Sequence, residues 1–313
     1  MLNQNNTLTS LSTKIIFWGT PEFALPSLKS VHDLGFLSLV ITQPDRQTGR
    51  GKKMASSPVK EYALENNIAI LEPEKLDQSF TNALKKYLPA TFLVVAYGKI
   101  IPQEILDLSQ LPAINIHPSM LPELRGPSPI QTAILRGFES TGLSLMQLDK
   151  KMDHGPILGQ IQVKIDPNES YIELSQRLAI IGAQILSEKL PDYLAGKISP
   201  LPQDDDKATY CKMISKEDGR IDWQKSAQEI HNQVRAFYPW PSAYTKLGDL
   251  DIKILKTEVV DIALTPGEIN NDLVVGTSEK SLKILELQPA NKKILKAAEF
   301  VRGYFKYLSQ KFS

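Results

Sequence analysis

The sequence predicts an α/β protein with two domains: a doubly wound, mostly parallel sheet, followed by a small antiparallel β-barrel. Three observations support this prediction. The chain has 313 residues, more than most single hydrophobic cores hold. The part before residue 198 alternates apolar strand-like runs with amphipathic helical segments, as βαβ units do. Beyond that part, short strands separated by turn residues dominate. We therefore expect a Rossmann-like domain and an OB-like barrel.

The predicted N-terminal domain covers 14–197 and follows a polar tail at 1–13. Its first strand is 14–19, and the next helix begins at Pro26, because proline is tolerated only in the first turn. Strands and helices then alternate along the chain: 36–42, 57–67, 69–71, 80–88, 91–98, 101–108 and 113–119. A helix with apolar residues at helical spacing follows at 171–190.

Residues 198–207 hold two prolines and three adjacent aspartates, so we predict a linker there. In the predicted C-terminal domain, 208–313, Ser226 and Glu229 have the spacing of a capping box that begins a helix. Short strands with turn residues between them follow: 242–247, 250–260, 272–278 and 281–289. Strands this close together favour a small antiparallel barrel.

Composition excludes several classes of protein. A hydrophobic content of 42%, a charged content of 23% and a net charge of +1 are ordinary for a globular protein and give no global attraction to nucleic acid or membranes. The single cysteine, Cys211, excludes an internal disulfide and a cysteine-based metal site. The tail does not resemble a signal peptide, and no apolar run approaches the ~20 residues of a membrane span. We expect a monomeric, cytoplasmic protein without membrane contact.

The segment NIHPSMLPELRGPSPI (115–130) follows a predicted strand. Side chains alternate along a strand, so Asn115 and His117 point to the same face. An amide and an imidazole at a strand end can donate hydrogen bonds to an oxygen that gains negative charge, and the imidazole can move a proton. A simpler role is also open, with Asn115 closing a turn and His117 hydrogen-bonded inside the core. Pro118 and Pro122 stiffen the loop, which could hold a flat ligand by shape.

A second polar group occurs in MQLDKKMDHGPIL (146–158). The carboxylate of Asp153 could orient a histidine or accept a proton, or it could form an Asx-turn before Gly155. Asp153 and His154 also resemble metal ligands, but no third and fourth ligand has suitable spacing, so we predict no metal site. FWGTPEF (17–23) has neither a dinucleotide nor a P-loop glycine pattern, so we expect no NAD or ATP.

Two segments are locally basic. In 42–60, TQPDRQTGRGKKMASSPVK, the cations are Arg46, Arg50, Lys52, Lys53 and Lys60. This segment fits either an arm that reaches phosphates or a solvated loop. The second, NKKILKAAEFVRGYFK (291–306), mixes cations with aromatic residues. It fits either a face that binds a nucleic-acid backbone or a solvated helix with an aromatic core stripe.

Together these segments carry a resemblance. Asn115-x-His117, the SMLPELRGPSPI loop and Asp153-x-Gly155 resemble the signature of enzymes that use 10-formyltetrahydrofolate. Further stretches, in order along both predicted domains, resemble the methionyl-tRNA formyltransferase family: FWGTPEFALPSL, TQPDRQTGRGKK with SPVK, VVAYGKIIP, RIDW, RAFYPWPSAY, LQPANKK and EFVRGY.

The resemblance implies an enzyme of translation initiation and one-carbon metabolism, with 10-formyltetrahydrofolate as co-substrate and initiator methionyl-tRNA as partner. Asn115 and His117 would stabilise the oxyanion formed when the methionyl amine attacks the formyl carbon, and Asp153 would orient His117 and help remove the ammonium proton. Two further groups of residues are implied. The folate would lie against Ser119, Met120, Leu121 and Pro122, with backbone near Tyr97 and Gly98. The tRNA would meet Arg46, Arg50, Lys52, Lys53 and the barrel.

Four departures from the family pattern leave the three catalytic positions intact: Pro118, Met120, His154 and the pair Glu123-Leu124. Two alternatives remain. A formyltransferase that acts on a small amine, such as a purine precursor or a sugar nucleotide, would share the catalytic residues but would not need the basic arm and barrel. A non-catalytic RNA-binding protein would not need Asn115, His117 and Asp153.

Overall fold

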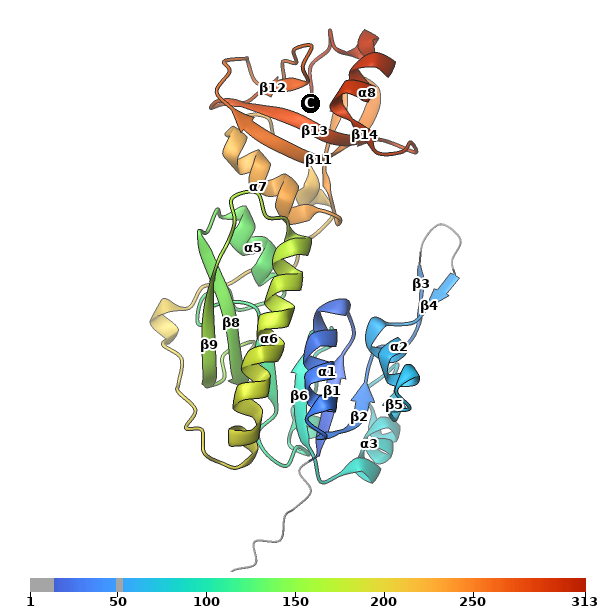
Figure 1. Cartoon of the computed structure of the whole chain (residues 1–313), viewed down its shortest axis with the longest axis vertical. Coiled ribbons are helices and arrows are strands. Elements are labelled where there is room, and N and C mark those ends of the chain that lie inside the picture. The colour runs from blue at the N-terminus through green and yellow to red at the C-terminus, as the bar shows by residue number, and fades with distance from the viewer. Residues whose placement is uncertain (1–13, 49–52) are drawn as a thin grey trace, which may run out of the picture. The chain divides into compact units, whose positions relative to one another are not determined.

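The computed structural model describes residues 14–48 and 53–313 (Figure 1). The chain forms two compact units with interleaved segments. The first comprises residues up to Pro122, Leu143–Ile161 and Arg177–Lys207; the second comprises Glu123–Gly142, Gln162–Gln176 and Ala208–Ser313. The domain boundaries expected at 14–197 and 208–313 stay a prediction.

The sheet of the first unit has the strand order β5-β2-β1-β6-β7-β8-β9. The strand bounds are Ile15–Gly19 (β1), Leu37–Ile41 (β2), Ile70–Leu71 (β5), Thr91–Val95 (β6), Ile114–His117 (β7), Ser140–Gln147 (β8) and Ile157–Lys164 (β9). Strands β5, β2, β1, β6 and β7 pair in parallel, and β8 pairs with β7 antiparallel. The prediction of a mostly parallel sheet is confirmed, although β8 and β9 were not predicted.

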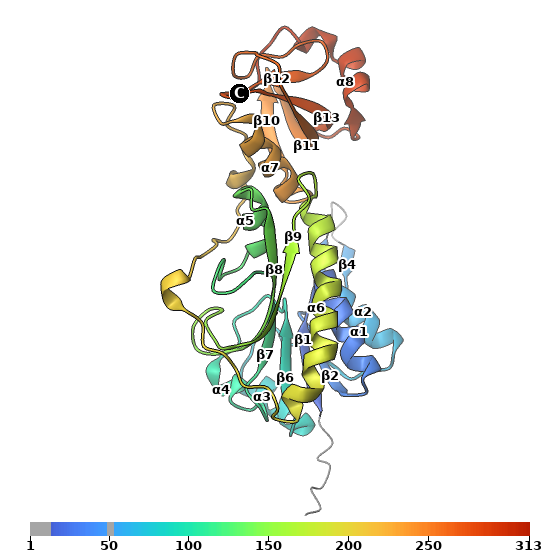
Figure 2. The same ribbon diagram turned by 60° about the vertical axis from the view of Figure 1, so that its left-hand side comes forward.

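Helices cover both faces of this sheet (Figures 1 and 2). The helical elements in this part of the chain have the bounds Glu22–Ala24 (η1), Leu25–Asp33 (α1), Pro58–Glu65 (α2), Gln78–Leu84 (α3), Lys85–Tyr87 (η2), Gln103–Leu106 (α4), Tyr171–Leu194 (α6) and Asp205–Lys207 (η3). Pro26 lies in the first turn of α1, as predicted. The helix predicted at 101–108 is shorter than expected, because α4 is a single turn.

The two faces of the sheet have separate apolar layers. On one face, Phe80 of α3 and Ile105 of α4 pack with Trp18 of β1 in one buried cluster. On the other face, α1 and α6 lie side by side, since the hydroxyl oxygens of Ser30 and Ser187 are 2.6 Å apart. The sheet is therefore buried on both faces at its centre, which explains the continuous apolar runs of its parallel strands.

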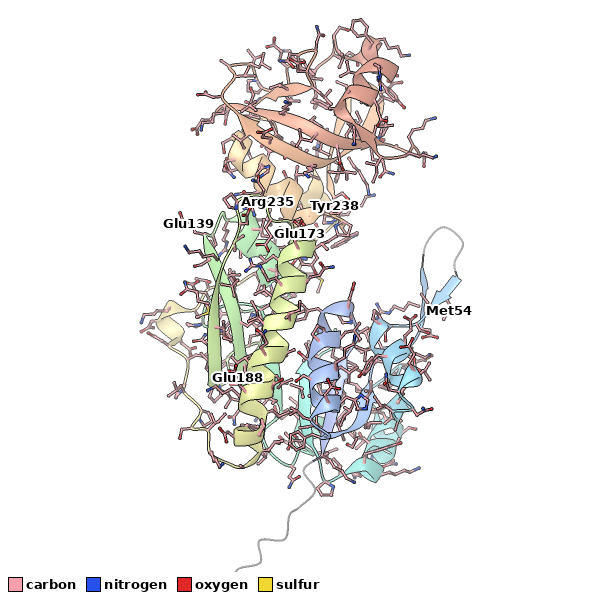
Figure 3. All side chains as sticks on the ribbon, in the orientation of Figure 1. Met54, Glu139, Glu173, Glu188, Arg235 and Tyr238 are labelled. Carbon is pink, nitrogen blue, oxygen red and sulfur yellow. The ribbon has the colours of Figure 1, made fainter. Side chains whose placement is uncertain are left out.

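Within the basic segment 42–60, β3 (Arg46–Thr48) and β4 (Lys53–Ala55) pair antiparallel, and Arg46 is opposite Ala55. Its base is fixed by Lys60 of α2, whose Nζ lies 2.9 Å from carboxylate oxygens of both Asp45 and Glu72. The hydrogen bond from Lys60 lowers the pKa of Asp45. Met54 of β4, labelled in Figure 3, is 61% exposed.

The second unit contains an antiparallel sheet in the order β10-β11-β13-β12, with β14 paired to β13. The elements of this unit are Pro129–Leu135 (α5), Glu217–Gly219 (η4), Ala227–Phe237 (α7), Ala243–Leu247 (β10), Leu250–Val260 (β11), Val274–Gly276 (β12), Ser281–Pro289 (β13), Leu295–Lys296 (β14), Ala297–Gly303 (α8) and Phe305–Tyr307 (η5). The predicted capping box is present: Ser226 Oγ accepts from Glu229 N, and the Glu229 carboxylate accepts from Ser226 N. The strands form the expected small antiparallel structure, as a half-barrel. None of the helices in the described part of the chain is long and apolar enough to cross a bilayer.

Candidate active site

Strand β7 places Asn115 and His117 on one face at the carboxyl end of the sheet. Asn115 is opposite Val94 of β6, and His117 is opposite Ser144 of β8. Ile116, between them, faces α6, where a Cβ added at Gly182 would lie 3.3 Å from its Cγ2. Because side chains alternate along a strand, Asn115 and His117 point away from α6. The expectation that they share a face is met.

The structure brings together His117, at the end of β7, and Asp153, in the turn between β8 and β9. His117 Nδ1 is 3.6 Å from Asp153 Oδ1, and the two side chains are only 5% and 15% exposed. This distance lies within ion-pair range and slightly beyond a normal hydrogen bond, as is common for catalytic pairs without substrate. The Asp153 carboxylate can therefore orient the His117 imidazole and exchange a proton with it.

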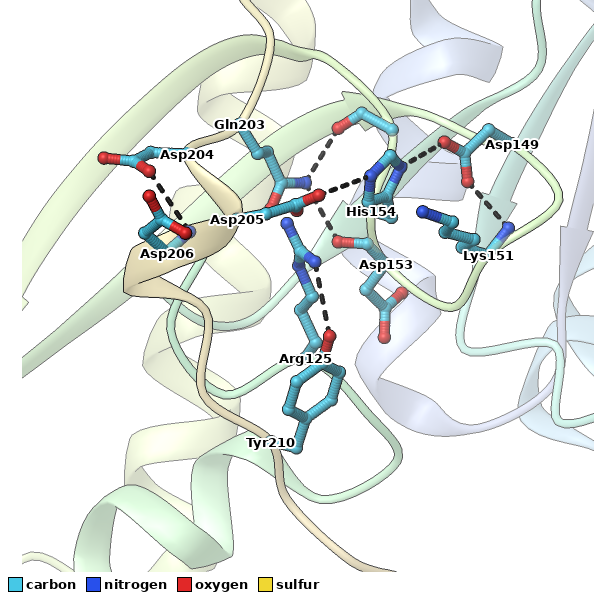
Figure 4. A network of polar contacts seen from close by, with 11 residues as sticks. Arg125, Asp149, Lys151, Asp153, His154, Gln203, Asp204, Asp205, Asp206 and Tyr210 are labelled. Atoms are coloured by element: carbon cyan, nitrogen blue, oxygen red, sulfur yellow. Dashed lines mark hydrogen bonds and ion pairs between the residues drawn. The ribbon is translucent and has the colours of Figure 1, made fainter.

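Asp153 has a left-handed backbone with φ of +50°, which non-glycine residues rarely adopt. The Asx-turn in this loop is made by Asp149, whose Oδ1 accepts from Lys151 N at 2.9 Å. His154 contacts two other carboxylates, with Nδ1 at 2.6 Å from Asp149 Oδ2 and Nε2 at 3.2 Å from Asp205 Oδ2 (Figure 4). The departure at His154 thus adds contacts on the side of the turn that carries Asp149.

The turn after His117 is fixed by two side chains that the sequence did not single out. Ser144 Oγ donates to Ser119 O at 2.7 Å and accepts from Leu121 N at 3.1 Å. Gln160 Nε2 donates to Leu121 O at 2.8 Å and to Ser144 Oγ at 2.9 Å. Ser144 is fully buried, and a buried hydroxyl needs such partners. The main chain of the turn is therefore held in one conformation.

The four predicted folate contacts in this turn differ in exposure. Ser119 and Leu121 are buried at 1% and 3% exposure, whereas Met120 and Pro122 are half-buried. Of the four side chains, Met120 and Pro122 are therefore the more accessible to a ligand.

Tyr97 and Gly98 follow β6, the neighbour of β7. The Tyr97 ring packs edge-on against Trp18 with centroids 5.2 Å apart, and burial raises the pKa of its hydroxyl to about 12. Its backbone carbonyl accepts from Thr20 Oγ1 and Gln43 Nε2. Gly98 is exposed with φ of +84°, and a Cβ there would lie 2.5 Å from Gln43 Nε2. Backbone rather than the Tyr97 ring is thus presented at this edge.

The predicted tRNA contacts are only partly described. Arg46 is exposed, and its guanidinium donates to Gln43 Oε1. Arg50 and Lys52 lie outside the described residues, as does the side chain of Lys53. Within 14–48 and 53–313, no group of three or more His, Cys, Asp or Glu side chains could hold a metal ion.

The site therefore combines an amide, an imidazole with a nearby carboxylate, and a fixed turn at the carboxyl ends of β6 and β7. Ligands bind at this edge in open α/β sheets. Such a set can donate hydrogen bonds to a carbonyl oxygen that gains charge and can take up a proton from an attacking group.

Comparison with known families and proteins gives matches along the chain. Residues 13–190 match the formyl transferase family, and residues 213–305 match the formyl transferase C-terminal domain. The methionyl-tRNA formyltransferase of Thermodesulfovibrio yellowstonii is 44% identical over 94% of this chain and 96% of its own length. That of Bacillus subtilis is 39% identical over 93% and 95%.

Solved structures share the fold. A sugar 3N-formyl transferase, WlaRD, crystallised with dTDP and 5-N-formyl-THF, has a TM-score of 0.67 at 24% identity, covering 90% of this chain and 99% of its own. HypX from Aquifex aeolicus, in complex with tetrahydrofolic acid, has a TM-score of 0.65 at 17% identity, covering 94% of this chain and 48% of its own.

Proposed function

Since this chain belongs to the methionyl-tRNA formyltransferase family and formylates initiator methionyl-tRNA, we propose that 10-formyltetrahydrofolate supplies the formyl group at a site built from Asn115, His117 and Asp153. The observation that carries this assignment is the approach of His117 to Asp153, 3.6 Å apart, beside Asn115 at the end of β7.

In the proposed reaction, the methionyl nitrogen bonds to the formyl carbon and the bond from that carbon to the folate nitrogen breaks. The attacking nitrogen loses a proton, and the folate nitrogen gains one. Asn115 and His117 donate hydrogen bonds to the formyl oxygen as it gains charge, and each such donor is worth about 3 kcal/mol in a dry site. Asp153 orients the His117 ring through Nδ1.

The turn at 119–122 and the backbone at Gly98 are proposed to hold the folate. They fit a flat ring system because the turn is fixed by Ser144 and Gln160, and because Gly98 has no side chain to obstruct the approach. A binding surface that is already ordered loses less conformational entropy when a ligand binds.

The basic arm is proposed to contact the tRNA backbone through Arg46, Arg50, Lys52 and Lys53. Its support is the charge of this segment, which has five cations and no acidic residue between 46 and 60, and the ion pairs of Lys60 that fix its base. Contacts with phosphates release counterions, so the use of tRNA would weaken as salt rises. The half-barrel is proposed to track the same backbone.

A substrate panel tests the proposed function. Purified protein is given 10-formyltetrahydrofolate labelled in the formyl group, together with initiator methionyl-tRNA, elongator methionyl-tRNA or glycinamide ribonucleotide. We expect label in the initiator tRNA and little in the other two. Transfer to glycinamide ribonucleotide alone would point to a small-amine formyltransferase, and binding of tRNA without any transfer would point to an RNA-binding protein.

The arm has its own test. Arg50→Ala is expected to raise the KM for tRNA several-fold, by about the 1 kcal/mol typical of a lost phosphate contact, and to leave the KM for folate unchanged. Lys85→Ala, a change of another cation in the same unit, serves as the control. An equal rise in both KM values would remove the arm from the tRNA site.

A further inference from the structure

The turn that carries Asp153 is held from outside by the segment 201–205, part of the predicted linker. Leu201 and Ile157 exchange two backbone hydrogen bonds, with N···O distances of 2.9 and 2.8 Å. This pairing extends the edge of β9 and places residues 203–205 against the turn at 153–155 (Figure 4). The segment is therefore packed on the first unit and close to the catalytic carboxylate.

Gln203 makes the central contacts. Its Nε2 donates to Asp153 O at 2.9 Å and to Gly155 O at 2.7 Å. A side-chain amide nitrogen has two hydrogens, so one Gln203 amide can satisfy both carbonyl groups. The two bonds bracket the stretch in which Asp153 has its left-handed backbone, with φ of +50°.

The opposite side of the turn is also fixed. A Cβ added at Gly155 would lie 2.0 Å from Gln147 O of β8, so the main chain of Gly155 is pressed against that strand. His154 links Asp149 to Asp205, but Asp205 is 56% exposed, and exposed ion pairs contribute little. Of these two side-chain contacts, that of Gln203 is therefore the stronger.

We propose that Gln203 is a positioning residue for formyl transfer: it holds the 153–155 turn so that the Asp153 carboxylate reaches His117. Residues in the left-handed region persist only where their surroundings enforce the conformation, and Gln203 supplies two of the bonds that do so. Without them the turn can relax, and the carboxylate moves away from the imidazole. This inference rests on the role proposed above for Asp153.

The test compares Gln203→Ala with wild type in steady-state formylation. A misplacement of a catalytic group by about 1 Å can cost up to about a hundredfold in rate, so we expect kcat to fall at least about tenfold. The KM values for folate and tRNA are expected to stay within about twofold, because Gln203 acts on the orientation of Asp153 and not on substrate contacts. Gln203→Glu keeps the shape but puts carboxylate oxygens against two carbonyl oxygens, and it is expected to lose as much.

Gln78→Ala is the matched control, since it removes an exposed glutamine bonded to Asn82 within α3, and its kcat is expected to equal that of wild type. The thermal midpoint of each variant is measured alongside. If wild-type protein transfers the formyl group and Gln203→Glu has the same kcat, the positioning role is overturned and the proposed function is not. A rise in both KM values together with a lowered thermal midpoint in both Gln203 variants would also overturn the positioning role, because it would indicate a general structural role. Wild-type protein that transfers no formyl group would overturn the proposed function as well.

Discussion

Asn115 and His117 owe their common face to the two-residue repeat of β7, whereas the third member of the site depends on an unusual backbone. Asp153 meets His117 from a turn with φ of +50°, and its side-chain direction follows from that angle. Asparagine and aspartate tolerate this region better than most residues do. The chemistry proposed for this site therefore depends on main-chain geometry as much as on side-chain type.

Substitution of either proposed donor should affect turnover more than binding. His117→Ala and Asn115→Ala are each expected to lower kcat about a hundredfold or more, because loss of one oxyanion donor has that effect, with smaller changes in KM. Single-turnover formylation measures the chemical step directly. Asn82→Ala, an exposed asparagine on α3, is the control. A His117→Ala variant with wild-type turnover would remove His117 from the mechanism.

Two buried tyrosines of the first unit provide a contrast in stability. Tyr97 is 2% exposed, and its hydroxyl has no hydrogen-bond partner among the described residues. Tyr193, 5% exposed, donates to Pro112 O at 2.7 Å and accepts from Gln147. Removal of a bonded hydroxyl leaves partners unsatisfied, whereas removal of an unbonded one does not. We expect Tyr193→Phe to lower the free energy of unfolding by about 1 kcal/mol and Tyr97→Phe to leave it unchanged or raise it, as urea titration would show.

The stability of the protein at alkaline pH depends on the raised pKa of Tyr97, about 12. In the unfolded chain a tyrosine ionises near pH 10, so between about pH 10 and pH 12 the unfolded state binds fewer protons than the folded state. Stability therefore falls as pH rises through this window. The free energy of unfolding of Tyr97→Phe should therefore decrease less than that of wild type over this pH range. An identical alkaline profile in wild type and Tyr97→Phe would contradict the burial of this hydroxyl.

At the scale of the elements, the turn at 119–122 that follows β7 is held by hydrogen bonds from side chains of β8 and β9. Both Gln160 and Gln162 of β9 donate to a serine of β8, but only Gln160 also donates to a backbone carbonyl of the turn, Leu121 O. The two glutamines are thus a matched pair that differs in its link to the proposed folate wall.

Gln160→Ala is expected to raise the KM for 10-formyltetrahydrofolate, and Gln162→Ala is not. Loss of two hydrogen bonds, each worth about 1 kcal/mol, corresponds to a rise of up to about thirtyfold if the wall loosens fully. Initial rates at varied folate and saturating tRNA measure this. The same rise in both variants would mean that β9 acts through its general stability, not through Leu121.

Prediction of the elements from the sequence succeeded where one pattern dominated. Pro26 marked the start of α1, Ser226 and Glu229 marked that of α7, and apolar runs marked β1 and β6. It missed β8, whose residues 141–146 are all buried, because burial on both faces removes the two-residue alternation and Ser, Thr and Gly interrupt the apolar run. Asn115 and His117 could be paired from spacing alone. Gln203 could not be identified, because nothing in a Pro- and Asp-rich segment signals which carbonyl groups it will meet.

At the scale of the whole molecule, the second unit draws on three separate stretches of chain. Arg125 N donates to Thr209 O, and Ser128 Oγ donates to Lys212 O at 2.6 Å. Arg235 of α7, labelled in Figure 3 and 7% exposed, donates through Nη1 to Glu169 O at 3.1 Å. Parts of 123–142 and 162–176 therefore form hydrogen bonds with polar groups of 208–313. Without these bonds, a buried charged group such as that of Arg235 would lower the stability of the fold.

This interleaving predicts that 208–313 is not a stable domain alone, although it contains every strand of the half-barrel. In the separate fragment, α7 loses its contact with α5 and Arg235 loses its bond to Glu169 O, so apolar and polar groups buried in the full chain become exposed. We expect the fragment to unfold at lower urea than the full chain and to bind a hydrophobic dye. A protein that joins 123–142 and 162–176 to 208–313 through flexible linkers should regain cooperative unfolding. A fragment of 208–313 that unfolds cooperatively without dye binding would instead place the folding boundary at the predicted linker.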